Sequence, residues 1–472
     1  MKRPCQFPLA LLFCTAAIVL VAGLPKTNAQ PPSAQPSTAQ PPTTQPSTAQ
    51  PPTTQPSTAQ PPTTQPTTTP APTQPGGSPA AGTPAAATSE EQVTDEQVLK
   101  AFQEKAPAED QEPGTAAVDA FHAAAAKLRA KTLEMRRQHT LVVNGYSDDT
   151  DLYRKLRTET RLLINQTYRA ALNLLDYMPY PTAARFAVTV LEHRVSHGVY
   201  DKDTHEGAAR LMDAGVRLLY VAQAAARAGM VTGDFDLADR IYEKLEDGEL
   251  EDTDRALLGQ EELIKKQFET EQELIANDPE DLPKARFLTT RGEIVVELFI
   301  NEAPSTVAHF INLIESGFYD GLDFFQVVDG LLALTGDPLG DGSARPERYI
   351  ADEHTGETVR MPLAGSLVMA KLPTAGNRDF VPNSAGTQFA ILFMPIPAII
   401  EHQTVFGRVI EGLDVVGELR RVDPTKEKEK NQIVLPPDRI LHAEMINRPE
   451  TLPEVNYAQP PGLADGPPAS GP

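Results

Sequence analysis

The chain has 472 residues, 44 of them proline and none tryptophan, and a formal net charge of −22. This length allows more than one domain. A strongly acidic chain lacks the electrostatic footprint of a nucleic-acid-binding protein, so we expect no nucleic acid partner.

Residues 1–29 have the three parts of a secretory signal peptide. Lys2 and Arg3 form a basic start, Phe7–Leu24 is apolar, and Thr27–Ala29 offers a small-residue cleavage site. We therefore predict export to the periplasm, the cell envelope or the medium. The alternative is an uncleaved N-terminal membrane anchor, because the apolar part approaches the length of a membrane span.

Residues 30–89 carry no charge and consist almost entirely of Pro, Thr, Gln, Ser and Ala. The decapeptide QPSTAQPPTT begins at Gln35, Gln45 and Gln55 without change. So few apolar side chains cannot offset the entropy of ordering, and proline favours extended backbone. We predict a disordered, semi-stiff linker that acts as a stalk. A repeat that expanded and is merely tolerated explains the composition equally well.

Residues 90–283 are rich in Ala, Leu, Glu, Arg and Lys, and we predict an α-helical domain there, either a bundle or a short repeat array. The run Leu218–Glu246 resembles one tetratricopeptide-type (TPR-like) helical hairpin, without a second copy at a fixed period. Such a domain offers a surface for a protein partner. The expected helices are Thr115–Gln138, Asp149–Asp176, Thr182–His197, Thr204–Gly229, Asp234–Glu246 and Thr253–Ala276.

Two histidines of this region, His193 and His197, are four residues apart and can share a helix face, as two metal ligands would. No glutamate lies between them and no third ligand stands out, which favours surface or capping roles. Both cysteines, Cys5 and Cys14, lie in the signal segment, so the mature chain would have no thiol. We expect neither a metal nor a cofactor.

Residues 284–448 alternate short apolar runs with glycine-rich turns, which predicts strands. We expect a mainly β domain in which eight or so strands form a closed barrel capped by two helices. Residues 449–472 are expected to be a disordered tail. The expected strands are Lys284–Thr289, Glu293–Phe299, Leu322–Val328, Leu331–Thr335, Ser366–Ala370, Thr387–Phe393, Val405–Val409 and Arg439–Ile446, with helices at Pro304–Gly317 and Leu413–Arg420.

Four segments in this order carry a family resemblance. They are EAPSTVAHFINLIESGFYDG from Glu302, GDPLGDG from Gly336, GTQFAI from Gly386 and TVFGRVIEGLDVV from Thr404. With them the domain resembles the cyclophilin-type peptidyl-prolyl cis-trans isomerases over 284–448. The resemblance implies partners that are proline-containing peptides or unfolded envelope proteins.

Isomerisation of an X-Pro bond needs no nucleophile, because the task is to weaken the amide resonance behind a barrier of roughly 18–20 kcal/mol. In the family an arginine donates to the prolyl amide and a glutamine helps to hold the neighbouring carbonyl. By resemblance the arginine position is Gln326, and the second family glutamine is kept as Gln388. We take these two as the candidate catalytic residues. A neutral donor forms weaker hydrogen bonds than a charged one, so we expect a rate lowered by roughly 10²–10³.

The resemblance also marks positions that contact substrate. Leu334 replaces a family glutamine, Ala390 replaces a pocket phenylalanine, and the chain is longer than the family pattern within Leu372–Pro382. The candidate substrate-binding residues are Phe324, Leu331, Leu332, Leu334, Ala370, Lys371, Phe389, Ala390, Ile399 and Gln403.

Three functions are compatible with these features. The first is an exported prolyl isomerase, of reduced activity, that assists the folding of envelope proteins. The alternative is a non-catalytic cyclophilin-like module that binds peptides or proteins beside a helical interaction domain. A purely structural spacer has compositional support alone.

Overall fold

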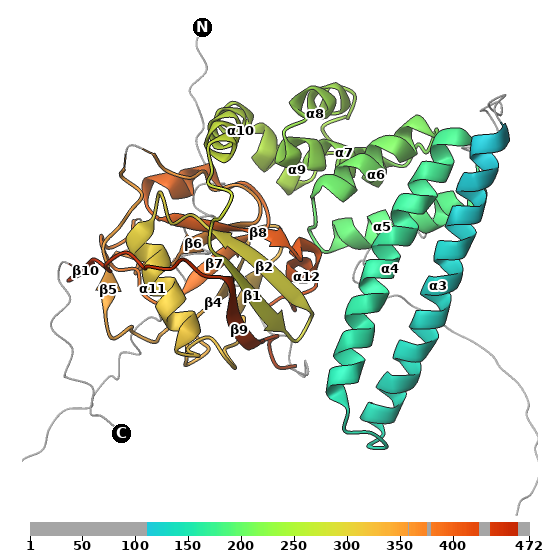
Figure 1. Cartoon of the computed structure of the whole chain (residues 1–472). Coiled ribbons are helices and arrows are strands. Elements are labelled where there is room, and N and C mark those ends of the chain that lie inside the picture. The colour runs from blue at the N-terminus through green and yellow to red at the C-terminus, as the bar shows by residue number, and fades with distance from the viewer. Residues whose placement is uncertain (1–110, 357, 375–378, 424–434, 461–472) are drawn as a thin grey trace, which may run out of the picture. The chain divides into compact units, whose positions relative to one another are not determined.

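The computed structural model describes residues 111–460 except 357, 375–378 and 424–434. The predicted signal segment and linker lie outside the described residues. A helical region is followed by a strand-rich domain (Figure 1), and the described parts of both belong to one compact unit. Among the described residues, none of the helices combines the length and apolar character that a membrane span needs.

The helical region begins with two long helices that lie side by side and antiparallel (Figure 1). Several helices start where an aspartate side chain accepts a backbone N–H: Asp149, Asp201 and Asp234 are such N-caps. The described helices are α3 (Gln111–Val143), α4 (Thr150–Tyr177), α5 (Pro181–Ser196), α6 (Lys202–Asp213), α7 (Leu219–Thr232), α8 (Phe235–Tyr242), α9 (Asp252–Leu258) and α10 (Glu261–Ala276).

Two predicted helices are each divided in the structure. The expected helix Thr204–Gly229 ends at Asp213, because Gly215 adopts φ +94° and the Val216 N–H bonds back to the Leu211 carbonyl at 2.9 Å. The expected helix Thr253–Ala276 likewise breaks after α9. Both single-helix predictions were wrong. The apolar spacing of the sequence continues through each break, so it does not indicate where the first helix ends. Helices α7 and α8 follow each other closely as a hairpin, and its TPR-like character stays a prediction.

The strand-rich domain is a curled antiparallel sheet with strand order β3-β4-β7-β6-β8-β2-β1-β9. The helices α11 (Pro304–Glu315) and α12 (Leu413–Gly417) contact β9 and β2 respectively (Figure 1). The strands are β1 (Lys284–Thr289), β2 (Glu293–Leu298), β3 (Gln326–Val328), β4 (Leu332–Thr335), β5 (Tyr349–Ile350), β6 (Ser366–Met369), β7 (Phe389–Leu392), β8 (Val405–Glu411), β9 (Ile440–Asn447) and β10 (Tyr457–Ala458).

Complete closure of the sheet into a barrel, as predicted, is not confirmed. The end strands β3 and β9 approach each other at an isolated bridge between Asp323 and Arg439, where the Phe324 N–H also donates to the Asp438 carbonyl at 2.8 Å. Strand β3 spans only three residues, which is too short for a continuous ladder along β9.

Part of the segment predicted as a disordered tail is ordered. Strand β10 pairs with β5, and the guanidinium of Arg348 lies 4.4 Å from the centroid of the Tyr457 ring. The predicted disorder was therefore wrong for these residues, because Leu452 and Val455 pack against the main core and the Asn456 N–H donates to Ser305 Oγ at 2.8 Å. Residues 461–472 lie outside the described part.

A buried arginine connects the helical region to the sheet. Arg360 is 0 % exposed, and its guanidinium lies 4.0 Å from the centroid of the Phe299 ring. It contacts Glu271 of α10 at 3.1 Å and Glu302 at 3.2 Å, and also pairs with Asp278. The backbone N–H of Met361 donates to Glu271 as well, at 2.9 Å. Three buried carboxylates thus meet at Arg360, and one of them, Asp278, also contacts Arg408 at 3.5 Å.

Replacing Arg360 with methionine is expected to lower the free energy of unfolding by about 3–5 kcal/mol, since it removes the cation that pairs with the buried carboxylates of Glu271 and Glu302. Arg286→Met provides the matched control, because its ion pair with Glu444 is exposed and should change stability by no more than about 1 kcal/mol. Denaturant unfolding of both variants measures the difference. Equal, small losses in the two would show that the Arg360 network contributes little.

Candidate functional site

The register of the sheet separates two faces, because successive side chains of a strand point to opposite sides. Residues paired directly across antiparallel strands share a face. One such row crosses β3, β4, β7 and β6 and joins the main hydrophobic core, and we call its side the core face. The row consists of Val327, Ala333, Ile391 and Leu367.

The neighbouring row lies on the opposite side of the sheet, which we call the site face. Gln326 pairs with Leu334, Leu334 with Ala390, and Ala390 with Val368. A second row adds Leu332 and further apolar residues on the same side. Gln326 and Leu334 occupy positions that the sequence assigned to the proline site. The fold therefore brings the candidate donor beside candidate pocket residues.

The site face is covered in this structure. Gln326 is 2 % exposed, and Leu332, Leu334, Ala390 and Ile399 are all buried. Side chains from other segments complete the apolar cluster over it, so a proline ring reaches this surface only after they are displaced. These covering residues are Leu282, Phe299, Phe380 and Ile396, with Leu331 and Ala370 partly buried at the margin.

Gln388 lies beside a small pocket rather than within the apolar cluster. Its amide nitrogen is 3.4 Å from the carbonyl oxygens of both Gly342 and Ala344. The loop that supplies these carbonyls is held by Asp337, a buried residue whose carboxylate accepts N–H groups from Asp341, Gly342 and Ala344 at 2.5–3.2 Å. Two other candidate residues, Ala370 and Lys371, line the same pocket, whose volume is about 20 Å³.

The two polar candidates at the margin are buried. The Lys371 ammonium group donates to Asp352 at 2.6 Å and to the His402 carbonyl at 2.9 Å. Gln403 is 1 % exposed, and its amide nitrogen has no hydrogen-bond partner among the described residues. Burial lowers the pKa of the nearby His354 below its ordinary value, and Lys371 adds to the effect. Lys371 is therefore engaged in an internal ion pair rather than free to meet a substrate.

The structure places Phe324 and Phe389 away from the other candidates. Each is 1 % exposed and belongs to the main core. The ring of Phe389 lies 5.2 Å from that of Phe310 and 5.5 Å from that of Tyr319, both in edge-on geometry. Because Phe389 and Ala390 are consecutive in β7, they point to opposite faces. A substrate-binding role for these two stays a prediction that their packing disfavours.

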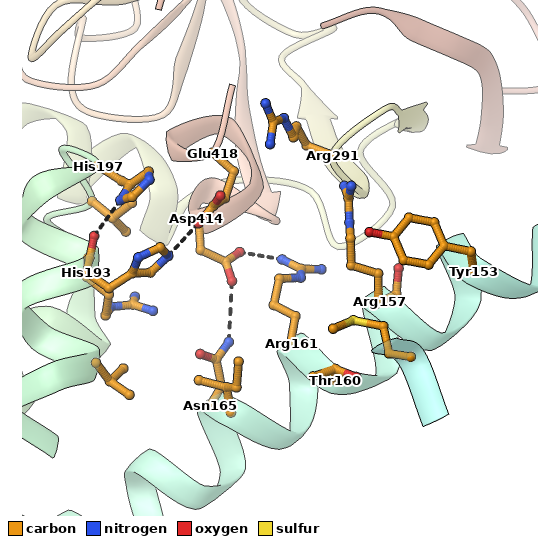
Figure 2. A pocket seen from close by; sticks show the side chains of 16 residues that line it. Tyr153, Arg157, Thr160, Arg161, Asn165, His193, His197, Arg291, Asp414 and Glu418 are labelled. Atoms are coloured by element: carbon orange, nitrogen blue, oxygen red, sulfur yellow. Dashed lines mark hydrogen bonds and ion pairs between the residues drawn. The ribbon is translucent and has the colours of Figure 1, made fainter. Parts of the chain in front are cut away.

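A larger pocket, of about 390 Å³, lies between α4, α5 and α12 (Figure 2). Arg161 of α4 contacts Asp414 at 2.5 Å, and His193 of α5 contacts Glu418 at the same distance. The Glu418 carboxylate accepts a hydrogen bond from the His193 imidazole, and this raises the pKa of His193. Burial lowers the pKa of Arg157, whose side chain also lines this pocket.

Sequence reasoning missed three residues of these sites. Phe380 could have been suspected, since it is the only aromatic residue in the extra segment Leu372–Pro382. Asp337 lies in the GDPLGDG motif, but its role in accepting the N–H groups of the loop is visible only in the structure. Glu418 lies 225 residues beyond His193, and nothing in the sequence joins the two.

Comparison with known proteins finds matches over the strand-rich domain. Residues 285–445 match the family model "Cyclophilin type peptidyl-prolyl cis-trans isomerase/CLD". A peptidyl-prolyl cis-trans isomerase of Helicobacter pylori is 34% identical over 149 residues, which cover 30% of this chain and 86% of that protein. One from Synechococcus elongatus is 39% identical over 137 residues, covering 29% of this chain and 87% of that protein.

Among solved structures, a cyclophilin type peptidyl-prolyl cis-trans isomerase from Cryptosporidium parvum aligns with a TM-score of 0.29 and 24% identity. The alignment covers 36% of this chain and 99% of that one. The family model spans the sheet from β1 to within β9, and the two sequence relatives are covered over most of their length. The chain therefore belongs to the cyclophilin-type peptidyl-prolyl cis-trans isomerase family.

Proposed function

We propose that this protein is an exported peptidyl-prolyl cis-trans isomerase of low turnover that assists the folding of envelope proteins. The observation that carries the proposal is the row formed by Gln326, Leu334 and Ala390 across three strands. This row places an amide donor beside an apolar surface. Catalysed rotation about an X-Pro bond requires both features. Family membership supports the same chemistry.

The low turnover follows from the donor. Gln326 can donate a hydrogen bond to the prolyl nitrogen, but it lacks the positive charge that makes such bonds roughly twice as strong. The apolar floor remains, whereas Ala390 leaves one wall of the pocket short. Proline-containing segments of unfolded proteins are the proposed substrates.

Export rests on the sequence of residues 1–29, with cleavage after Ala29. An uncleaved anchor would instead let the linker that follows hold the folded part away from the membrane. N-terminal sequencing of protein recovered outside the cytoplasm is expected to begin at Gln30. A protein that keeps Met1 and sediments with membranes would instead identify an uncleaved anchor.

A second function, a binding module without catalysis, is favoured by the cover over the site face. Gln326 is almost completely enclosed, and Phe380 belongs to the apolar cluster beside it. In this alternative the helical region and the remaining surface of the sheet contact the partner. The two functions differ in whether a proline residue of the bound peptide or protein reaches the site face.

Replacing Gln326 with arginine is expected to raise kcat/KM for a short X-Pro peptide by one to two orders of magnitude, because a charged donor is restored. Gln326→Leu removes the donor and should lower the rate below that of the natural protein. Protease-coupled or NMR exchange assays on the full chain measure all three.

Activity at the level of other family members in the natural protein would contradict the binding-module alternative. Equal activity in the natural protein and Gln326→Leu would show that Gln326 is not the donor. An absence of activity in all three would show that the pocket, rather than one donor, is lost.

Replacing Phe380 with alanine is expected to strengthen the binding of a proline peptide at least about tenfold, since the uncovered state becomes the major one. Loss of a buried aromatic side chain should also lower the free energy of unfolding by roughly 3 kcal/mol. Val381→Ala is the control in the same segment, because Val381 is not part of the cluster. Peptide titration by calorimetry checks this, and unchanged affinity in Phe380→Ala would mean that Phe380 does not occlude the site.

A further inference from the structure

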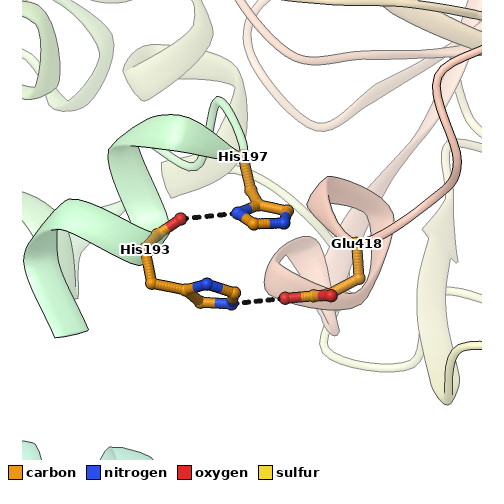
Figure 3. Close-up of side chains that lie close together, drawn as sticks. All are labelled: His193, His197 and Glu418. Carbon is orange, nitrogen blue, oxygen red and sulfur yellow. Dashed lines mark hydrogen bonds and ion pairs between the residues drawn. The ribbon is translucent and has the colours of Figure 1, made fainter. Parts of the chain in front are cut away.

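Two histidines and a glutamate from distant parts of the chain converge at one point (Figure 3). His193 Nε2 lies 2.5 Å from Glu418 Oε1, and the imidazole rings of His193 and His197 have centroids 4.1 Å apart. One potential ligand atom from each of the three side chains lies within 4.8 Å of the other two. The sequence offered the two histidines, and the fold supplies the third group.

His197 is held in the tautomer that a metal ligand needs. Its Nδ1 lies 2.7 Å from the backbone carbonyl oxygen of His193. A carbonyl can only accept, so Nδ1 carries the proton and Nε2 keeps its lone pair. Metal-binding histidines commonly donate their second ring N–H to a carbonyl in this way.

Glu418 is positioned by the close packing of α12 against the end of α5. A Cβ atom on Gly417 would lie 2.4 Å from Val199 Cγ2 and 3.0 Å from the His197 carbonyl oxygen, so only glycine permits this approach. Arg421 bridges the two segments by donating to the His197 carbonyl at 2.8 Å and to the Gly417 carbonyl at 2.6 Å. The three side chains therefore meet through a built contact between elements.

The donor set selects the kind of cation. Two imidazoles and one carboxylate suit zinc and neighbouring divalent transition metals. Calcium and magnesium instead take sets of oxygen ligands. Ligand atoms of a tetrahedral zinc site lie roughly 3.3 Å apart, so a small rotation of the side chains of His193 and Glu418 makes room for the ion.

We propose that His193, His197 and Glu418 bind a zinc-class divalent cation, which ties the helical region to the cyclophilin-type domain. The three residues line the pocket of about 390 Å³ described above, so the remaining coordination position faces that pocket and can take water or an anionic group. This site is separate from the site face, and the proposal does not depend on isomerase activity.

The test is zinc titration of the full chain carrying Cys5→Ser and Cys14→Ser, which removes every thiol. We expect one equivalent to bind with high affinity, and His197→Ala or Glu418→Gln to weaken it by more than about 100-fold, since losing a ligand costs at least as much as losing an outer-shell partner. His442→Ala is the matched control, because His442 also pairs with a carboxylate, Asp320 at 2.9 Å, in an exposed pair. It should leave zinc affinity unchanged.

X-ray absorption of the zinc-loaded chain that carries only Cys5→Ser and Cys14→Ser keeps the proposal testable if a ligand variant fails to fold. It should show two imidazoles at about 2.0–2.1 Å from the metal. The proposal is overturned if the thiol-free chain with all three ligands binds no zinc, if the ligand variants bind as tightly as the control, or if the absorption spectrum lacks imidazole scattering. The three groups would then form only an ion pair between the two regions.

Discussion

The period-two alternation of an antiparallel sheet is the constraint on which this structure depends. In β4 and β7, every second side chain enters the aromatic core around Phe310, and the residues between them form the site face. Packing of the main core and the proposed contact with substrate thereby fall to different residues of the same strands. This explains how positions such as Leu334 and Ala390 can depart from the family pattern while the fold is kept: they lie outside the main core, whereas Phe389 lies within it.

The arginines described above stabilise the fold and do not lie on the site face. By resemblance, the position of the family's site arginine is Gln326 in this chain. Arg360 forms ion pairs with buried carboxylates of α10 and of a neighbouring segment, and Arg161 forms an ion pair with Asp414 of α12. Removing one member of a buried network leaves its partners uncompensated. The helical region is thus fixed to the domain at two places, and the proposed cation would strengthen the second.

Much of the domain was predictable because its signals are local. Alternating apolar residues gave most strands, Pro304 marked the start of α11, and the ordered motifs identified the family. The helix breaks at Gly215 and after α9 were missed because apolar spacing continues through them. The cover provided by Phe380 and the convergence of Glu418 on His193 depend on long-range packing, which one sequence does not encode in any local pattern. That Phe324 and Phe389 belong to the main core, apart from the other candidates, is evident only from the structure.

The most direct test of this account is methyl NMR of the full chain during titration with a short proline-containing peptide. We expect the methyl signals of Leu332, Leu334 and Ala390 on the site face to shift, while those of Ala333 and Ile391 on the core face stay in place. These residues alternate along the same two strands, so each serves as a control for its neighbour. Shifts confined to other parts of the molecule, or none at millimolar peptide, would contradict the assignment of the site face as the proline site.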